Sequence, residues 1–382
     1  MELSHEDSLR LNVLLAQQLQ AVRIDESAMV VHALTERGEA KVPLRPTGRD
    51  DHYLRAVREL LSTHVLDSPG GYPVYLRRWT RMGQARTGSL DRLLLLGEPE
   101  AVVAVVHAEG LSDELARRAW WAMPIADNAR CMLERESVAG GSMGPELAAF
   151  LVEFLPFEEE PRAIMDSVRL VLKPGLIDES TRLQLWNRAK RKNTYFVGFL
   201  QALPDALPES APPHPQHPYA QARLDALCEA ANPIALQLVR CLSAAGQAYL
   251  KTAEEVLLKP NNQDVVVALL ETLAEYFAAA CPAVGAAPDI EAILVQASAS
   301  DPDDAGQEGA LQAVRDAAPE LDAEITAMRV LAQLGETLVA PVFARTDAIG
   351  TVMRRKIEPI TTPILERLRL LRGVVDASGR PV

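Results

Sequence analysis

Residues 110–121, GLSDELARRAWW, decide the fold class, because a related stretch, GLIDESTRLQLW, follows 65 residues later at 175–186. The two stretches share Gly, Leu, Asp, Glu, Arg and Trp at identical spacing. Asp and Glu suit the first turn of a helix, where carboxylates interact favourably with the helix dipole. The sequence therefore predicts an internal duplication of helical units, with copies at 98–130 and 160–195. The positions that define this structural repeat are Gly110, Asp113, Arg117, Trp121, Gly175, Asp178, Arg182 and Trp186.

Each copy carries the same helix signals. A proline, Pro99 or Pro161, begins the first helix, and a glycine follows its end. Arg and Trp four residues apart share one face of the second helix, where the guanidinium is expected to cover the indole. A unit of this length with several short helices resembles a HEAT-like helical repeat. Two copies would also fit a domain of paired helices instead of a solenoid.

Length and composition support a mainly helical protein of two domains. The chain has 382 residues, which is long for one compact core. Aromatic residues make up only 5%, whereas Ala and Leu, the strongest helix formers, are abundant. We predict an all-α fold of HEAT-like helical repeat pairs, with a small N-terminal β-hairpin and a second helical domain.

Gly and Pro residues, which interrupt helices and strands, divide the chain into five segments. Ser4-x-x-Asp7 resembles a capping box at the start of a helix, and residues 22–44 alternate around a turn at 36–39 as a hairpin does. The segments are 1–48 (helix and hairpin), 49–203 (helical repeats), 204–219 (Pro-rich linker), 220–345 (C-terminal helices) and 346–382 (amphipathic helix and tail). Helices within the last two helical segments are predicted at 233–245, 246–258, 264–280, 289–299, 319–340 and 363–371.

Charge, cysteines and hydropathy exclude several classes of protein. A net charge of −13 argues against binding nucleic acid or anionic membrane through the overall field. Acidic residues near the N-terminus are unlike a signal peptide, and no apolar run approaches the roughly 18 residues of a membrane helix. We expect a cytoplasmic protein with no membrane contact. Four cysteines lie far apart in apolar helical stretches and are expected to be reduced core residues: Cys131, Cys228, Cys241 and Cys281.

Residues 140–144, GGSMG, match the G-x-S-x-G nucleophile elbow of α/β-hydrolases. The elbow requires a buried strand before Ser142, yet the preceding residues have a helical pattern. It also requires a downstream histidine, and both of these, His214 and His217, fall in the Pro-rich segment. We interpret 140–144 as a flexible loop between helices.

No other motif predicts catalytic, cofactor-binding or metal-binding residues. The pair His214 and His217 would form an H-x-x-H motif, but extended Pro-rich chain does not place both rings on one face, so an exposed linker is favoured. The acidic run 158–160 is interpreted as a solvated approach to a helix. The sequence contains no phosphate-binding or dinucleotide-binding glycine motif, and no cofactor is expected.

Two basic stretches stand out in this acidic chain. The favoured interpretation is a solvated helix face. The alternative is an interaction patch for RNA phosphates, with Trp79 or Tyr195 stacking on a base. The residues of this possible patch are Arg77, Arg78, Trp79, Arg81, Arg188, Lys190, Arg191 and Lys192.

Three long strings resemble the DsrS family, which is encoded among the dissimilatory sulfur-oxidation genes of sulfur-oxidising bacteria. They are SPGGYPVYLRRWTRMGQ (68–84), residues 93–130, which begin LLLLGEPEAVVAVV, and KPNNQDVVVALLETLAEYF (259–277). The resemblance runs over residues 1–280. It implies a cytoplasmic accessory or regulatory protein that acts alongside reverse dissimilatory sulfite reductase, and it supplies no catalytic residues.

Together these observations predict a non-enzymatic scaffold that holds a protein partner of the sulfur-oxidation system. The alternative is a post-transcriptional regulator that contacts RNA through the basic stretches. The third possibility is an uncharacterised enzyme.

Overall fold

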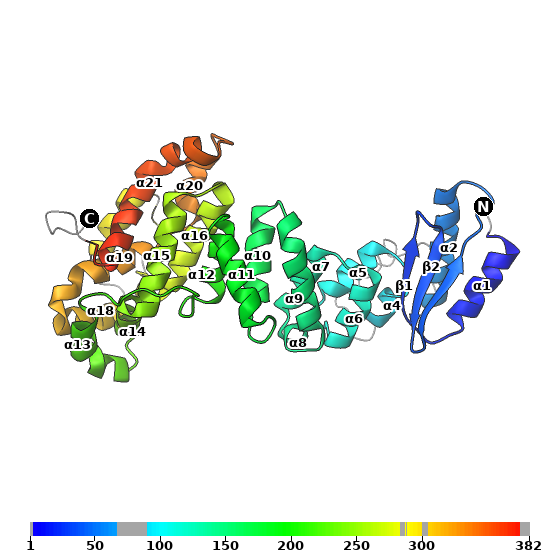
Figure 1. The fold of residues 1–382 in the computed structure, drawn as a ribbon, viewed down its shortest axis with the longest axis horizontal. Coiled ribbons are helices and arrows are strands. Elements are labelled where there is room, and N and C mark those ends of the chain that lie inside the picture. The colour runs from blue at the N-terminus through cyan, green and yellow to red at the C-terminus, as the bar shows by residue number, and fades with distance from the viewer. Residues whose placement is uncertain (1–2, 67–89, 283–286, 288, 300–304, 375–382) are drawn as a thin grey trace. The chain divides into compact units, whose positions relative to one another are not determined.

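The structure, a computed structural model, describes residues 3–66, 90–282, 287, 289–299 and 305–374. The chain forms two compact units, residues 1–156 with 173–177, and residues 157–172 with 178–382. Helices make up most of both units, and one small antiparallel sheet lies near the N-terminus (Figure 1). The predicted fold class, mainly α with a small β element, is confirmed.

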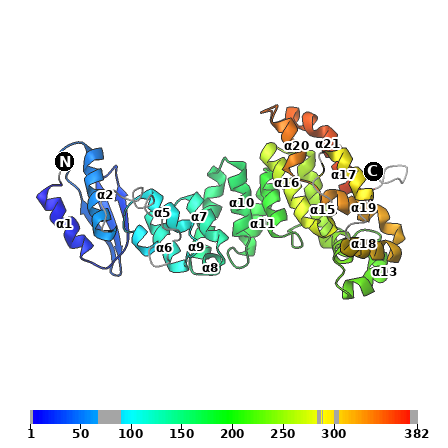
Figure 2. The ribbon, with the colours of Figure 1, turned by 180° about the vertical axis from the view of Figure 1, so that it is seen from behind.

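The first unit begins with a sheet flanked by helices. The predicted hairpin is confirmed as β2 and β3, and an additional strand, β1, gives the sheet order β1-β2-β3. Helices α1 and α2 lie on one side of this sheet, and α4 to α6 lie on the other (Figures 1 and 2). The elements are α1 (His5–Leu15), β1 (Leu19–Asp25), β2 (Val30–Thr35), β3 (Gly38–Pro43) and α2 (Asp50–Leu66).

A buried carboxylate joins α1 to its neighbours. Ser4 caps α1 by accepting a hydrogen bond from the amide of Asp7, as the capping box predicts. Asp7 itself accepts from the hydroxyl of Tyr53 at 2.5 Å and from the amide of Arg45 at 2.8 Å. Burial raises the pKa of Asp7, but these hydrogen bonds outweigh it and leave the pKa lowered. The contacts fix α1 against α2 and against the chain that leaves β3.

Short helices complete the first unit. The amide of Val22 in β1 donates to the carbonyl of Leu94 at 2.8 Å, so the outer edge of β1 is joined to the segment after α4. Gly97 has φ +66°, a conformation that residues with a side chain rarely adopt, and a β-carbon there would lie 3.0 Å from the Ile24 side chain. Glycine avoids both the backbone strain and the close contact. The helices are α4 (Leu90–Leu93), α5 (Pro99–Val106), α6 (Asp113–Ala122), α7 (Ala126–Glu134), α8 (Glu136–Ala139) and α9 (Met143–Phe154), followed by the 3-10 turn η2 (Leu155–Phe157), whose last residue belongs to the second unit.

The described residues of the second unit form helices and the turns between them, and none forms a strand. Its helices are α10 (Pro161–Val171), α11 (Glu179–Ala189), α12 (Thr194–Ala202), α13 (His217–Glu229), α14 (Pro233–Leu242), α15 (Ala244–Leu258), α16 (Gln263–Tyr276), α17 (Ile290–Ser298), α18 (Ala305–Ala317), α19 (Asp322–Leu331), α20 (Glu336–Phe343) and α21 (Gly350–Leu371), with 3-10 turns η3 (Ala278–Ala280) and η4 (Pro319–Leu321). The helices predicted at 233–245, 246–258, 264–280 and 289–299 correspond to α14, α15, α16 with η3, and α17.

Two predicted helices differ from the structure. The helix predicted at 319–340 is broken into η4, α19 and α20, because extended backbone at Gly335 interrupts it. The helix predicted at 363–371 begins earlier, at Gly350, and runs through Pro359 and Pro363. Apolar side chains along α21 are buried at helical spacing from Met353 to Leu371, and this packing offsets the hydrogen bonds that the two prolines cannot donate.

The Pro-rich segment 204–219, predicted as a linker between domains, lies inside the second unit. Asp205 accepts two hydrogen bonds from the Arg240 guanidinium, at 2.8 and 2.7 Å, and Glu209 pairs with Lys251 at 2.9 Å. The expectation that His214 is exposed is wrong: its ring is buried, and burial lowers its pKa. Ion pairs to α14 and α15 hold the segment in place, so it does not separate two domains.

None of the helices in the described parts of the chain is both long enough and apolar enough to span a membrane.

Candidate interaction site

The duplicated stretches form helices that begin as the sequence predicts. Pro99 and Pro161 are the first residues of α5 and α10. Glu114 and Glu179 lie in the first turns of α6 and α11, beside Asp113 and the N-cap residue Asp178. Gly175 has φ +81°, a conformation in the left-handed region that glycine adopts without strain.

The expected contact between Arg and Trp within each copy is not found. Arg117 donates two hydrogen bonds to Glu114, at 2.9 and 2.8 Å, and Arg182 forms an ion pair with Glu179. A different arginine, Arg23 of β1, lies over Trp121 at 4.7 Å. In each copy the glutamate three residues before the arginine lies on the same helix face. Its carboxylate is within reach of the guanidinium and forms charge-assisted interactions with it. The hydrogen bonds from Arg117 and Arg118, with the charges of both arginines, outweigh the effect of burial and lower the pKa of Glu114 to about 2.

The buried tryptophans of the two copies are not the pair that the sequence aligns. Trp186 is 3% exposed and makes an edge-to-face contact with Phe196 at 4.8 Å. In the first copy Trp120 is buried and makes the same kind of contact with Phe150, also at 4.8 Å. Trp121 is only half-buried. The rings that the sequence aligns, Trp121 and Trp186, therefore differ in burial.

Asp113 and the GGSMG stretch together form a junction between helices. Asp113 accepts from the amide and hydroxyl of Ser142, at 3.0 and 2.7 Å, and from the amide of Met143 at 3.0 Å. A β-carbon on Gly141 would lie 2.2 Å from the Asp113 carboxylate, and one on Gly144 would lie 2.3 Å from a backbone carbonyl oxygen. Helix α8 precedes the stretch, so its placement between helices, and not after a strand, is confirmed. The Asp113 carboxylate, and not the Ser142 side chain, caps the start of α9, and the glycines leave room for this close packing.

Asp113→Asn is expected to lower the free energy of unfolding of the first unit by about 0.5–2 kcal/mol, the range for losing a helix cap. A single amide oxygen cannot replace two carboxylate oxygens that accept three hydrogen bonds. Burial raises the pKa of Asp113, but its hydrogen bonds with Ser142 and Met143 outweigh it and leave the pKa below 3.8. The stabilisation is therefore present above pH 3.8 and is lost as the pH falls through the folded-state pKa. Thermal unfolding from pH 7 to pH 2 should show the difference between variant and parent shrinking.

Asp178→Asn is the matched control for this prediction. Asp178 caps α11 by accepting a hydrogen bond from the amide of Thr181 at 2.8 Å, which the oxygen of an asparagine can also accept. A loss at Asp178 equal to the loss at Asp113 would contradict the role assigned to Asp113.

The predicted basic patch is only partly formed. Arg77, Arg78, Trp79 and Arg81 lie outside the described residues. Arg188, Lys190 and Arg191 are exposed at the end of α11, but the Lys192 ammonium donates to the carbonyl of Glu158 at 3.3 Å. Tyr195 is buried, so it cannot stack on a base; burial raises its pKa, and the neighbouring Arg188 lowers it by less. The stretch 188–192 therefore offers cations, and of the two predicted stacking partners Tyr195 is not available, while Trp79 lies outside the described residues.

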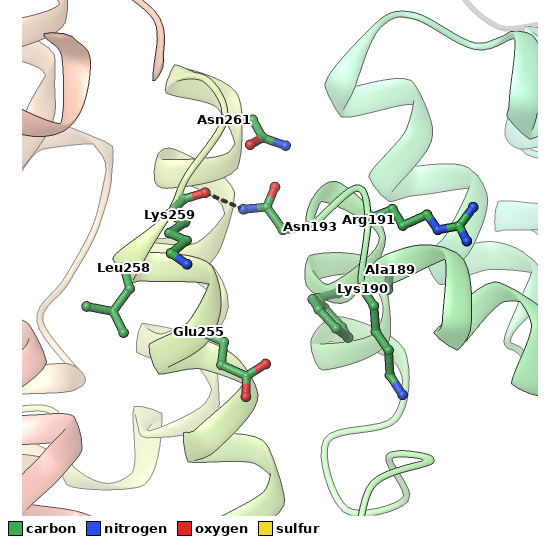
Figure 3. Close-up of a pocket in the computed structure, with 9 residues that line it drawn as sticks. Ala189, Lys190, Arg191, Asn193, Glu255, Leu258, Lys259 and Asn261 are labelled. Atoms are coloured by element: carbon green, nitrogen blue, oxygen red, sulfur yellow. Dashed lines mark hydrogen bonds between the residues drawn. The ribbon is translucent and has the colours of Figure 1, made fainter. Parts of the chain in front are cut away.

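Part of this stretch borders a cleft of about 410 Å³. One wall is the turn between α11 and α12, and the other is the end of α15 with the turn toward α16 (Figure 3). Asn193 joins the walls, because its side-chain amide donates to the carbonyl of Lys259 at 2.7 Å. The cleft is lined by Ala189, Lys190, Arg191, Asn193, Phe196, Glu255, Leu258, Lys259 and Asn261.

The cleft is cationic. Lys190, Arg191 and Lys259 carry three positive charges among the lining residues, against the single carboxylate of Glu255. In Figure 3 the Asn193 and Asn261 side chains approach each other across the opening, whereas Arg191 extends away from α15. An anionic group could accept hydrogen bonds from both lysines and from the asparagine amides.

Sequence reasoning found one wall of this cleft and missed the other. The residues 255–261 lie more than 60 positions beyond the basic stretch, and only folding of the second unit brings them together. The polar break KPNN at 259–262, between two apolar helices, was the available signal.

Within the described residues, no group of three or more His, Cys, Asp or Glu side chains could hold a metal ion. The four cysteines are free, and Cys241 alone is fully buried, which raises the pKa of its thiol well above the usual range.

Comparison with protein-family models, with curated proteins and with solved structures finds no match to this chain.

Proposed function

We propose that this chain is an accessory scaffold protein of sulfur oxidation, and that the cleft between 189–193 and 255–261 binds an acidic segment of a partner protein. The observation that carries the proposal is the concentration of three cations around an open cleft in a chain whose net charge is −13. A negatively charged partner is repelled by most of this protein and attracted at the cleft, which favours one docking position.

The charges of the cleft are available to a partner. Among the described residues, neither Arg191 nor Lys259 forms an ion pair, and Lys190 is exposed beside Glu209, whose pKa it helps to lower after the larger effect of Lys251. Carboxylates of a bound segment would form charge-assisted hydrogen bonds with Lys190 and Lys259, and Arg191, which extends away from α15, adds positive charge beside the cleft. Phe196 and Leu258 add an apolar floor on which the stem of an acidic side chain can rest.

The link to sulfur oxidation rests on the resemblance of residues 93–130 and 259–277 to the DsrS family. The second of these strings includes Lys259 and Asn261, so it supplies part of the cleft. A cytoplasmic accessory role, in which the protein holds a component of the sulfur-oxidation machinery without catalysing a reaction, accords with this placement.

RNA is the second candidate ligand, because exposed Arg188, Lys190 and Arg191 could equally contact phosphates. The burial of Tyr195 and the hydrogen bond of Lys192 to a backbone carbonyl weaken this alternative. The acidic-segment proposal is therefore preferred.

The test uses the full chain with Lys190→Glu, Arg191→Glu and Lys259→Glu combined. Affinity purification from a sulfur-oxidising bacterium, with both protein and RNA identified, should recover a partner with an acidic segment through the wild-type chain. A labelled poly-glutamate peptide should bind the purified wild-type chain, and the triple variant should bind it at least about tenfold more weakly, since each lost charge-assisted bond contributes roughly 1.5–3 kcal/mol before solvent screening.

The control carries the same charge change at exposed positions outside the cleft lining: Arg37→Glu, Arg55→Glu and Arg92→Glu. Equal peptide binding by the cleft triple variant and the wild type would overturn the proposal. A different result would favour the RNA alternative: the wild type retains single-stranded RNA in a salt-dependent way and does not bind the peptide. In that case the cleft triple variant and the variant Lys190→Glu/Arg191→Glu/Lys192→Glu should both lose the RNA.

A further inference from the structure

Strand β3 forms an unpaired edge of the sheet. The amide of Leu44 donates to the carbonyl of Met29, and this bond fixes the alternation of the ladder between β2 and β3. Even-numbered residues of β3 therefore bond to β2, whereas the backbone groups of Glu39 and Lys41 point outward. Within the described residues no protein group bonds to those outward amides and carbonyls. The opposite edge of the sheet is different, because Val22 of β1 bonds to Leu94.

An apolar groove runs beside this edge. Leu9 and Val13, one turn apart on α1, are 66% and 58% exposed. They line a cavity of about 380 Å³ together with the β3 residues 40–43. Exposed apolar side chains next to an unpaired strand edge are the combination that natural sheets usually avoid unless another strand covers them.

The Glu39 carboxylate pairs with Arg23, His32 and Lys41 of its own chain, and the charges at 39 and 41 still favour one register for a strand that covers the edge. In an antiparallel pair of two β3 strands centred on Ala40, Glu39 of each copy lies directly opposite Lys41 of the other. Shifting the centre to residue 39 or 41 would place two glutamates or two lysines opposite each other, and like charges in that position destabilise a sheet. Because the backbone groups of both residues point outward, each Glu39–Lys41 pair can exchange both of its hydrogen bonds.

We propose that two copies of this chain associate through β3, in antiparallel register centred on Ala40, with Leu9 and Val13 of both copies packed over the junction. The occupant of the groove is thus a second copy, chosen by the self-complementary sequence Glu39-Ala40-Lys41. Twofold pairing uses the free edge of both sheets, so the assembly closes as a dimer.

The register makes a specific prediction about charge variants. In Glu39→Lys, the introduced lysine of one copy would face Lys41 of the other at both pairs. In Lys41→Glu, Glu39 would face the introduced glutamate at both pairs. The repulsion between like charges should make each variant monomeric when it is alone. A mixture of the two should form a heterodimer, since lysines of one chain then face glutamates of the other at both pairs. Light scattering after size exclusion should give twice the 41.7 kDa chain mass for the wild type and for the mixture, and the single-chain mass for each variant alone.

Two further variants keep the test independent of folding. Lys41→Pro removes the outward amide together with the lysine charge and should also give a monomer, whereas a change at the exposed Arg55 of α2, Arg55→Glu, should leave the chain dimeric. Circular dichroism should show the same helical content in all variants. A wild-type chain of single mass at every concentration up to about 100 µM, or a mixture that stays monomeric, would overturn the proposal.

Discussion

Replacing Arg369 and Arg372 together by Met should lower the free energy of unfolding of the second unit by about 3–5 kcal/mol. Both arginines lie at the end of α21 and bind one carboxylate, Glu254 of α15. The Glu254 side chain is only 8% exposed, and it accepts a hydrogen bond from Nε of Arg369 at 2.8 Å and another from the Arg372 guanidinium. Without the arginines, a buried carboxylate has no opposite charge to compensate its lost hydration.

The loss of stability depends on whether the buried carboxylate of Glu254 remains after the arginines are removed. Arg369 and Arg372 are more exposed than Glu254, so they can turn toward water when the carboxylate is absent. Adding Glu254→Leu to the double variant should therefore recover most of the lost stability, because a well-packed apolar group can replace a buried ion pair at little cost.

Urea unfolding followed by circular dichroism measures both steps. Arg355→Met with Arg367→Met, in the same helix but away from Glu254, is the matched control and should change stability by under about 1 kcal/mol. A double variant at 369 and 372 that is no less stable than this control would show that the Glu254 cluster is not needed to hold α21 against α15.

Local signals in the sequence predicted the helices of this chain well. Asn232 with Pro233 marks the start of α14, and Pro161 marks the start of α10. These signals act within a few residues, so no knowledge of packing is needed to use them.

Features that depend on packing were predicted less well. Nothing within reach of residues 204–219 indicates that Asp205 meets Arg240, which lies 35 positions later. The choice between Trp120 and Trp121 depends on where Phe150 lies, and the second wall of the cleft depends on the packing of α12 against α15. Each of these is settled by contacts between distant segments, which periodicity and propensity do not describe.

Gly246→Ala should destabilise the second unit, although alanine is the better helix former. Gly246 lies in the first turn of α15, where a β-carbon would lie 2.3 Å from the carbonyl oxygen of Arg240 and 2.4 Å from that of Cys241. Both atoms belong to the backbone of α14, which ends at a serine that also caps α15, so neither can move without opening the turn. Overpacking of this kind costs about 1–3 kcal/mol, and more where backbone must shift.

Gly309→Ala makes the same chemical change with the opposite expected sign. Gly309 is exposed in α18, and no heavy atom lies within 4 Å of the position that its β-carbon would take. Alanine there should raise the free energy of unfolding by about 0.5–1 kcal/mol, since it restricts the unfolded chain and favours the helix. Thermal unfolding of the two variants beside the wild type should move the midpoint down for Gly246→Ala and up for Gly309→Ala. Upward shifts in both variants would mean that helix propensity, and not the approach of α14 to α15, sets the residue at 246.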